Sequence, residues 1–211
     1  MPLARDLLSD MCSSSLPACA AQQQAVIPVC EIHSMSMEQL TYPWMHLFFG
    51  KETEKYKFVH LSSNILFLPY GVAVDEFQHI IYENPDMTPT ERKKVWLAIE
   101  KKYRPWTDYD GVDYLERGGF WQKQGHIYRS PFYYIDYCLA QLCAFQFWSK
   151  GRKDFKSAWA DYLRLCRAGG SQSFLGLVKL AGLHSPFEEG LFEPLFAELE
   201  TYLNSIDDKA M

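Results

Sequence analysis

The sequence predicts an all-α protein in which helices pack on helices, and three observations support this prediction. No segment of the 211 residues sustains the alternation of apolar and polar residues that is typical of strands. Apolar residues instead recur at helical spacing, in segments that begin at capping residues and end at glycine or proline. Hydrophobic residues make up 48% of the chain and aromatic residues 16%, which is ample material for a helical core.

The first 28 residues differ from the rest of the chain. They contain the runs Ser13–Ser15 and Gln22–Gln24, carry no aromatic residue and have no sustained helical period. We expect residues 1–28 to be a poorly ordered or misassigned N-terminus. Residues 29–208 are then expected to form the helical part of the protein.

Proline and glycine divide the first two expected helices. A helix over residues 29–49 should be kinked or split by Pro43, because proline removes a backbone donor and clashes with the preceding turn. The next helix, over residues 52–83, should break in the middle at Pro69 and Gly71.

Capping residues mark the start of the following helix. Thr88 and Glu91 form a capping-box pattern, and Pro89 between them suits the first helical turn. This helix should run to about Tyr103. A long loop rich in aspartate, glycine and aromatic residues is expected over residues 105–130, and loops of that length are usually functional or mobile.

The last part of the chain is predicted to hold four helices. Ser130-Pro131 should open a helix that ends near Gly151, by the same capping logic. An amphipathic helix is expected over residues 154–167, stopped by Gly169-Gly170. Two shorter helices are expected over residues 173–182 and 192–204.

Composition and charge exclude several classes of function. The net charge of −5 argues against nucleic acid as a partner, because phosphate binding needs clustered lysine and arginine. No apolar run of about 18 residues is free of charge, so no membrane span is expected. None of the six cysteines forms a CxxC pair, which argues against a zinc knuckle. Asp6 and Asp10 interrupt what would be the apolar centre of a secretion signal, so we expect a reducing, cytoplasmic location.

The segment from Cys30 to Glu38 concentrates ionisable and sulfur-containing residues. On a helix, Glu31, Met35 and Glu38 share one face, because residues four and seven apart line up. We expect this stripe to be buried, and two buried carboxylates are costly unless a metal, a cation or hydrogen bonds satisfy them. A pair of acids that caps or salt-bridges within a helical protein is the alternative interpretation. His33 points to another side of such a helix.

A second candidate site lies between Gly125 and Tyr137. Tyr133 and Tyr137 are four residues apart and Tyr134 and Tyr137 three apart, so several phenol groups should face one cavity with His126 at its entrance. Phenol and imidazole donors of this kind stabilise the oxyanion of a tetrahedral intermediate. Plain aromatic packing, with the hydroxyl groups reaching water, is the alternative interpretation.

A third pattern is the pair Glu76-x-x-His79, which is the spacing used in di-iron carboxylate bundles. Such bundles need a second pair of this kind, and none of the six histidines provides it. The alternative is a surface acid beside an ordinary histidine.

Four blocks of the sequence, in order, resemble the oligoendopeptidase F and Pz-peptidase-type family of zinc metallopeptidases, which are relatives of thimet oligopeptidase. The blocks are residues 31–38, residues 68–78, the stretch from His126 to Tyr137, and Gly169-Gly170-Ser171 followed by residues 177–182. The resemblance extends over residues 29–205. It implies an almost wholly helical fold with a deep channel, and cleavage of short peptide substrates at internal bonds.

The resemblance also implies roles for particular residues. In the family, one zinc ion is bound by the two histidines of an HExxH helix and by a later glutamate, which corresponds to Glu31. Glu38 corresponds to a neighbouring acid that supports the zinc ligands. The family's donors to the transition state correspond best to His126, Tyr134 and Tyr137, and less well to Tyr133. The glutamate of HExxH acts there as the general base.

This sequence departs from the family pattern in one decisive respect, because it contains no HExxH. By family spacing, the second zinc-binding histidine would fall near Asp6. We therefore expect the chain to be the C-terminal portion of such a peptidase, with a truncated, misassigned or frameshifted start, and an HExxH helix to be encoded upstream or in another frame.

Three functions follow as hypotheses. The first is a peptidase fragment that is inactive by itself and has the missing N-terminal part as its partner. Such a fragment would expose an apolar face and would aggregate or need that partner. The second is a non-catalytic helical domain that binds peptides. The third is a di-iron bundle built on Glu31, Glu38, Glu76 and His79.

Overall fold

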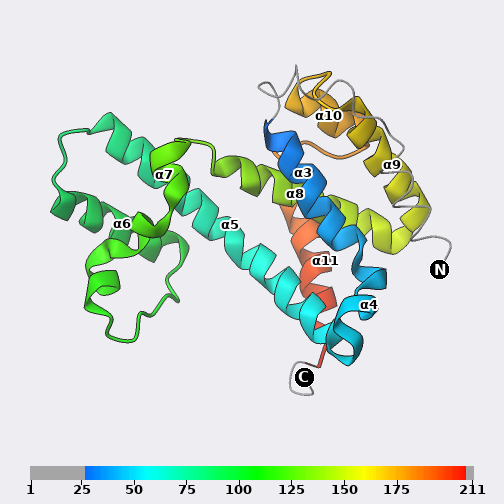
Figure 1. Cartoon of the computed structure of the whole chain (residues 1–211), viewed down its shortest axis with the longest axis horizontal. Coiled ribbons are helices and arrows are strands. Elements are labelled where there is room, and N and C mark those ends of the chain that lie inside the picture. The colour runs from blue at the N-terminus through cyan, green and yellow to red at the C-terminus, as the bar shows by residue number, and fades with distance from the viewer. Residues whose placement is uncertain (1–26, 208–211) are drawn as a thin grey trace. The chain divides into compact units, whose positions relative to one another are not determined.

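A computed structural model describes residues 27–207, and these residues fold into helices without any strand (Figure 1). The predicted all-α class is therefore confirmed for this part of the chain. The expectations for residues 1–26 lie outside the described residues. The α-helices are α3 (Ile27–Leu40), α4 (His46–Phe49), α5 (Thr53–Glu83), α6 (Pro89–Tyr103), α7 (Gly125–Arg129), α8 (Ile135–Lys153), α9 (Phe155–Ala168), α10 (Phe174–Leu180) and α11 (Phe192–Asn204). Short turns of other helix types are η1 (Tyr42–Trp44), η2 (Gly50–Glu52), η3 (Leu115–Gly119) and η4 (Phe120–Lys123).

The described residues form two compact units. Unit 1 comprises residues 27–42 and 142–199, and unit 2 comprises residues 43–141 and 200–207. Helices α8 and α11 each contribute residues to both. Across residues 27–207, none of the helices combines the length and apolar character that crossing a membrane requires.

In unit 1, helices α3, α9 and α10 pack against one another. Tyr162 of α9 lies edge-on to His33 of α3, with ring centroids 6.3 Å apart, and its hydroxyl donates to the His33 carbonyl at 3.0 Å. Helix α9 begins where Asp154 accepts a hydrogen bond from the Ser157 amide and ends at Gly169, whose φ of 52° is readily adopted by glycine. Both ends of α9 agree with the prediction from sequence.

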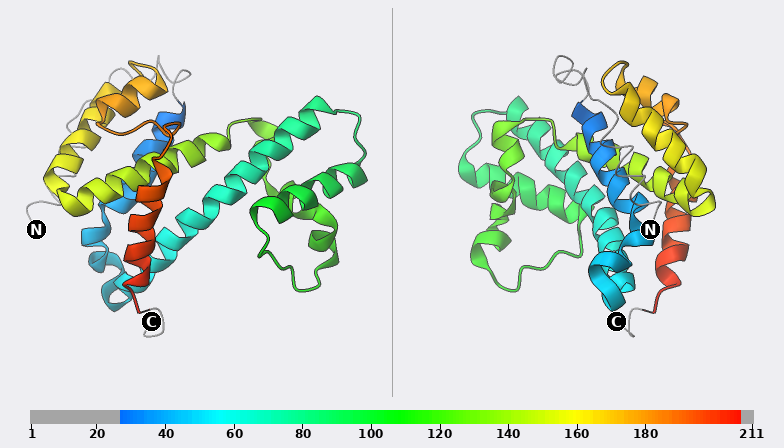
Figure 2. Two further views of the ribbon diagram at one scale, coloured as in Figure 1. Left: turned by 180° about the vertical axis from the view of Figure 1, so that it is seen from behind. Right: turned by 45° about the vertical axis from the view of Figure 1, so that its right-hand side comes forward.

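In unit 2, helix α6 packs along the long helix α5 (Figure 2). The Phe77 ring lies 5.5 Å from the Trp96 ring and 4.8 Å from the Trp121 ring, which joins α5, α6 and η4 in one core. The predicted capping box is present, since Thr88 accepts from the Glu91 amide and Glu91 accepts from the Thr88 amide. The buried residues of this core are Ala73, Val74, Phe77, Trp96, Ile99, Trp121 and Ile127.

Helix α5 corrects one expectation. The split expected at Pro43 is present, because Pro43 lies in η1, between α3 and α4. The break expected at Pro69 and Gly71 is wrong, because α5 is one helix of 31 residues. A Cβ atom added to Gly71 would lie 2.2 Å from Cys138 Sγ, and Cys138 in turn donates to the Leu68 carbonyl at 3.8 Å. Gly71 therefore permits a close approach between two helices and does not interrupt its own.

The start of α8 corrects a second expectation. The helix expected from Ser130 begins at Ile135, because residues 130–134 form a turn in which Phe132 has a φ of 61°. The buried Gln78 side chain accepts a hydrogen bond from the Phe132 amide at 2.8 Å, which offsets the cost of this left-handed conformation. The expected loop over 105–130 is also largely short helical turns, namely η3, η4 and α7.

Candidate functional site

One histidine and three tyrosines of unit 2 form a cluster, which we call the His126 cluster. The His126 ring lies 5.0 Å from the Tyr134 ring, 5.7 Å from Tyr137 and 5.9 Å from Tyr133. Tyr137 also contacts the other two tyrosines, at 5.1 Å to Tyr133 and 5.5 Å to Tyr134. All four side chains are partly exposed, so they remain accessible to a ligand. The structure therefore brings together the four residues that the sequence grouped.

The cluster is assembled from three backbone segments. His126 lies in α7, Tyr133 and Tyr134 lie in the turn before α8, and Tyr137 lies in the first turn of α8. The expectation that all three tyrosines share one helix is therefore wrong, because only Tyr137 lies in α8. Left-handed Phe132 redirects the chain just before the tyrosines, so the turn and the helix together place the phenol rings around the imidazole.

A buried amide orients His126. The Gln124 side-chain nitrogen lies 2.6 Å from His126 Nδ1, and the Tyr70 hydroxyl donates to Gln124 Oε1 at 2.8 Å. Tyr70 belongs to α5, and its ring meets that of Tyr134 edge-on at 5.8 Å. Helix α7 is also tied to α5, because the Tyr82 hydroxyl donates to the Ile127 carbonyl at 3.1 Å.

The hydroxyl and thiol groups beside the cluster remain protonated near neutral pH. Burial, together with the nearby Cys138 and Tyr137, raises the pKa of Tyr134 to about 12. Burial, with a smaller effect of Asp75, raises the pKa of Cys138 to about 12. Burial likewise raises the pKa of Tyr70. Tyr134 is therefore a neutral hydrogen-bond donor, as recognition of a carbonyl oxygen or an oxyanion requires.

The two acids predicted to bind or support a metal lie on α3, in unit 1. Glu31 is partly buried and Glu38 is exposed. The buried face of α3 is instead formed by Val29, Ile32, Ser36, Gln39 and Leu40. The acidic stripe thus borders the buried face and does not form part of it, which corrects the expectation that both carboxylates are buried.

The donor set in this chain does not fit a complete zinc site. Within residues 27–207, no three histidine, cysteine, aspartate or glutamate side chains come close enough together to hold a metal ion. All six histidines of the sequence fall in that range, and none belongs to an HExxH. Structural zinc needs four ligands and catalytic zinc needs three, so Glu31 cannot retain the ion without further ligands.

Two residues of the di-iron hypothesis, Glu76 and His79, have other partners. Glu76 accepts hydrogen bonds from Lys102 at 2.8 Å and from the Tyr103 hydroxyl at 2.5 Å. His79 Nε2 lies 3.5 Å from Asp75, one turn away on the same helix. These contacts account for both side chains as parts of the α5 surface, and they do not support a metal site.

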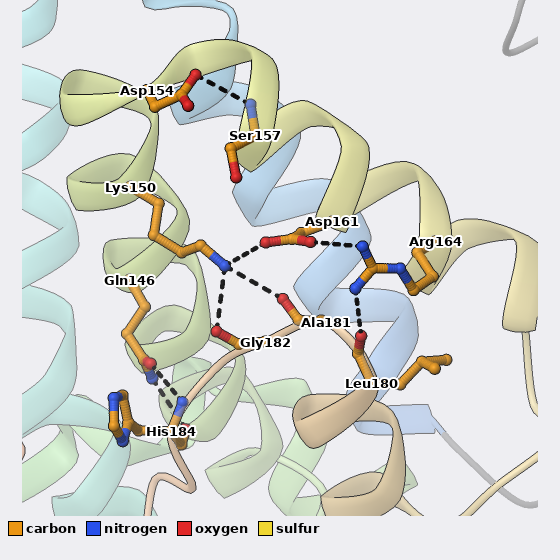
Figure 3. Close-up of polar contacts among 10 residues, drawn as sticks. All are labelled: Gln146, Lys150, Asp154, Ser157, Asp161, Arg164, Leu180, Ala181, Gly182 and His184. Carbon is orange, nitrogen blue, oxygen red and sulfur yellow. Dashed lines mark hydrogen bonds and ion pairs between the residues drawn. The ribbon is translucent and has the colours of Figure 1, made fainter.

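A polar network in unit 1, which we call the Asp161 network, contrasts with the His126 cluster (Figure 3). Lys150 Nζ lies 2.5 Å from Asp161 Oδ2, 3.1 Å from the Gly182 carbonyl and 3.4 Å from the Ala181 carbonyl. Arg164 contacts the other Asp161 oxygen at 2.9 Å and donates to the Leu180 carbonyl at 3.0 Å. The network joins α8 and α9 to the segment that follows α10.

Sequence reasoning missed two residues of the site, Gln124 and Tyr70. They are 54 residues apart, so no local pattern links them. Gln124 stands next to the Gly125-His126 pair, which is too common an arrangement to single out an amide, and Tyr70 lay inside the family-like block of residues 68–78 without a role assigned to it. Gln78, which fixes the turn before α8, lay inside one of the four family-like blocks but had no role assigned to it.

Comparison with known proteins places these features in a family. The model of peptidase family M3 matches residues 7–195 of the chain. A search of curated proteins finds no match.

Three solved structures are similar to this chain. A structure of Pz peptidase A with an inhibitor is 62% identical over 87% of this chain, with a TM-score of 0.85. A protein assigned as oligoendopeptidase F is 62% identical over 89% of this chain, with a TM-score of 0.86. Another protein with that assignment, from Bacillus anthracis str. Ames, is 52% identical over 87% of this chain, with a TM-score of 0.74. The chain spans 33%, 33% and 30% of the length of these three proteins, which is about a third of each.

Proposed function

This chain belongs to peptidase family M3, and we propose that it provides the peptide-binding part of a zinc-dependent oligoendopeptidase but does not hydrolyse peptides by itself. The proposed ligands are short peptides, which are bound through their backbone carbonyl groups. The supporting observation is the His126 cluster, in which an imidazole and three phenol groups lie within ring distances of 5.0–5.9 Å.

The chemistry of the cluster suits a peptide carbonyl. Tyr134 is a neutral O–H donor because its pKa is raised to about 12, and His126 has one ring nitrogen that is not engaged by Gln124. Neutral donors hydrogen-bond a carbonyl oxygen and bind more strongly to the oxyanion that replaces it in a transition state. His126, Tyr134 and Tyr137 are the proposed binding residues, with Tyr133 beside them.

Hydrolysis requires groups that this sequence does not contain. Peptidases of this family depend on zinc, and the HExxH that would supply two ligands and the general base is absent from the sequence. In the complete site, Glu31 is the proposed third ligand and Glu38 its neighbouring support. Because these two residues do not make a site by themselves, peptide turnover by the chain alone is not expected.

Peptide binding can be tested on the purified chain. A fluorescent short peptide should bind in an anisotropy titration, and a quenched peptide should not be cleaved with or without added zinc. Tyr134→Phe should weaken binding about tenfold, which corresponds to the loss of one hydrogen bond of about 1.4 kcal/mol. Tyr128→Phe is the matched control, because Tyr128 is exposed and outside the cluster. Cleavage by the chain alone, or equal weakening by both variants, would contradict the proposal.

A second function, that of a non-catalytic peptide-binding domain, is favoured by the same absence of HExxH from the sequence. Complementation separates the two possibilities. The chain would be mixed with the part of Pz peptidase A that it does not match, and hydrolysis of a quenched peptide would be measured. Restored hydrolysis that His126→Ala abolishes supports the peptidase part, whereas binding without any restored turnover supports the non-catalytic domain.

A further inference from the structure

The contacts of His126 point to a function for a side chain outside the four clustered residues. Gln124 is buried, with 9% of its surface exposed, and it lies between Tyr70 and His126. Its amide nitrogen faces His126 Nδ1 at 2.6 Å and its amide oxygen faces the Tyr70 hydroxyl at 2.8 Å. Each end of the amide therefore has one partner of defined chemistry.

The atom of Gln124 that faces His126 Nδ1 indicates which ring nitrogen carries the proton. An amide nitrogen can only donate, so His126 Nδ1 must accept and cannot carry a proton. A neutral imidazole with an unprotonated Nδ1 carries its proton on Nε2. At the other end of the amide, the Tyr70 hydroxyl donates to Gln124 Oε1 at 2.8 Å, and burial raises the Tyr70 pKa, so this hydroxyl keeps the proton that it donates.

We propose that Gln124, held by Tyr70, is a positioning residue that keeps His126 in the tautomer with the proton on Nε2. This inference rests on the proposed function, in which His126 donates to a peptide carbonyl or oxyanion. With Nδ1 occupied by Gln124, Nε2–H is the only N–H donor the neutral ring can offer to a ligand. The opposite tautomer would present a lone pair to the carbonyl oxygen and repel it.

The orientation of the Gln124 amide depends on the contacts at both of its ends. A glutamine side chain can rotate and exchange its oxygen and nitrogen, and the His126 contact alone would tolerate the oxygen if Nδ1 were protonated. In the orientation found here, the Tyr70 hydroxyl donates to the amide oxygen and the amide nitrogen faces His126 Nδ1. Tyr70 is itself fixed in α5, with its ring edge-on to Trp96 at 6.3 Å and to Phe120 at 5.8 Å.

The tautomer can be measured directly by nitrogen NMR of the full chain labelled in histidine. At a pH where His126 is neutral, the protonated and unprotonated ring nitrogens resonate far apart and identify the tautomer. In the wild-type chain, His126 should show its proton on Nε2. A wild-type ring with the proton on Nδ1 would overturn the inference, and this result needs no variant to fold.

Two variants and a control test the cause. Gln124→Glu replaces the donating nitrogen by an acceptor, so the major tautomer should switch to the one with the proton on Nδ1. Tyr70→Phe keeps the ring but removes the donor, so the wild-type preference should fall to a mixture. Gln122→Glu makes the same chemical change at an exposed glutamine two residues away and should leave the tautomer unchanged. An unchanged tautomer in Gln124→Glu would overturn the inference, as would a switch in Gln122→Glu.

Peptide affinity separates this inference from the proposed function. If both hold, Gln124→Glu should switch the tautomer and weaken peptide binding about tenfold, the effect of one lost hydrogen bond. If Gln124→Glu switches the tautomer but the wild-type chain binds no peptide, the proposed function is rejected and the positioning role stands. If the wild-type chain binds peptide but Gln124→Glu leaves the tautomer unchanged, the positioning role is rejected and the proposed function stands.

Discussion

The Asp161 network and the His126 cluster are both groups of polar side chains, yet they are built in opposite ways. In the network, a lysine and an arginine share one carboxylate, and three ammonium hydrogens of Lys150 have three acceptors. In the cluster, an imidazole and three phenol rings lie next to one another, and Gln124 engages one nitrogen of His126. The network joins helices through charges that it satisfies internally, whereas the cluster presents donors.

This difference gives a criterion for separating structural from functional polar groups. A charge that is taken out of water must be paired with an opposite charge and with hydrogen-bond partners. Once it is paired, the group has no further hydrogen bond to make with a ligand. A neutral donor that is partly exposed to water costs less free energy when it has no protein partner. It is therefore available to bind a carbonyl oxygen. The Asp161 network should therefore affect stability more than binding, and the His126 cluster should affect binding more than stability. Four predictions test this contrast.

The largest loss of stability is expected for Asp161→Asn. This change removes the shared charge from beneath Lys150, whose side chain is 30% exposed, and from beside Arg164. Asp161 is mostly buried, and both partly exposed cations would lose a charge-assisted hydrogen bond, so the free energy of unfolding should fall by about 3 kcal/mol, as measured by urea denaturation.

The control for this prediction is Asp113→Asn. Asp113 also pairs with an arginine, Arg117, but both side chains are mostly exposed, at 75% and 64%. Its loss should cost about 0.5 kcal/mol or less.

Peptide affinity of the folded Asp161→Asn chain should equal that of the wild type. A weakened affinity would break the proposed separation between the two polar groups.

A smaller loss is expected for Gly71→Ala, which acts on the helix contact behind the cluster. The added Cβ would lie 2.2 Å from Cys138 Sγ, so α5 and the start of α8 must move apart. Overpacking costs about 3 kcal/mol, and the better helix propensity of alanine returns about 1 kcal/mol, for a net loss of about 2 kcal/mol. Urea denaturation measures this loss, and peptide affinity should fall with it because Tyr137 directly precedes Cys138.

A second substitution identifies the cause of that loss. Cys138→Ala removes the sulfur atom that the new methyl group would meet, and the next nearest atom, in Phe67, is 3.5 Å away. The double variant Gly71→Ala with Cys138→Ala should therefore be more stable than the sum of the two single effects predicts. Simple additivity would show that the close approach at Gly71 does not limit the packing.

Helix caps should have still smaller and similar effects in the two units. Asp154→Ala removes the carboxylate that accepts from the Ser157 amide at the start of α9, in unit 1. Thr88→Ala removes one half of the capping box of α6, in unit 2. Each change should lower the free energy of unfolding by about 1 kcal/mol in urea denaturation. Losses much larger than the Asp161→Asn effect would mean that caps, and not the network, dominate stability.

Features of the fold that depend on neighbouring residues were predicted correctly from the sequence, whereas features that depend on distant residues were not. The ends of α6 and α9 were predicted because Thr88, Asp154 and Gly169 act on neighbouring backbone groups. The break expected in α5 and the early start expected for α8 were wrong because each depends on a distant residue. Cys138 occupies the space at Gly71, and Gln78 binds the amide of Phe132.

The candidate site shows the same limit. His126 and its tyrosines lie within twelve residues of one another, so their grouping was visible in the sequence before the fold was known. Gln124 is oriented by Tyr70, which is 54 residues away, and nothing in either neighbourhood reveals the other. The part played by Glu31 remains a prediction from family resemblance, because its proposed partners are not in this sequence.

The ionisation of Tyr134 has no effect on stability near neutral pH, and at the alkaline limit it tests the cluster alone. Burial raises the pKa of Tyr134 from its ordinary value of about 10 to about 12, and the neighbouring Cys138 and Tyr137 add to this shift. A folded-state pKa above the unfolded value means that the folded chain holds the proton more tightly. The stabilisation is fully present below pH 10 and is lost as the pH rises from about 10 to about 12. Tyrosinate absorbance across this range should show one fewer late-ionising tyrosine in Tyr134→Phe than in the wild type, and urea denaturation should show a shallower fall in stability. Cys138→Ala should lower the pKa of Tyr134 by less than the full shift, because burial is the larger cause. A Tyr134 that ionises at its ordinary pKa would show that the cluster is more open to water than the ring contacts of His126 indicate.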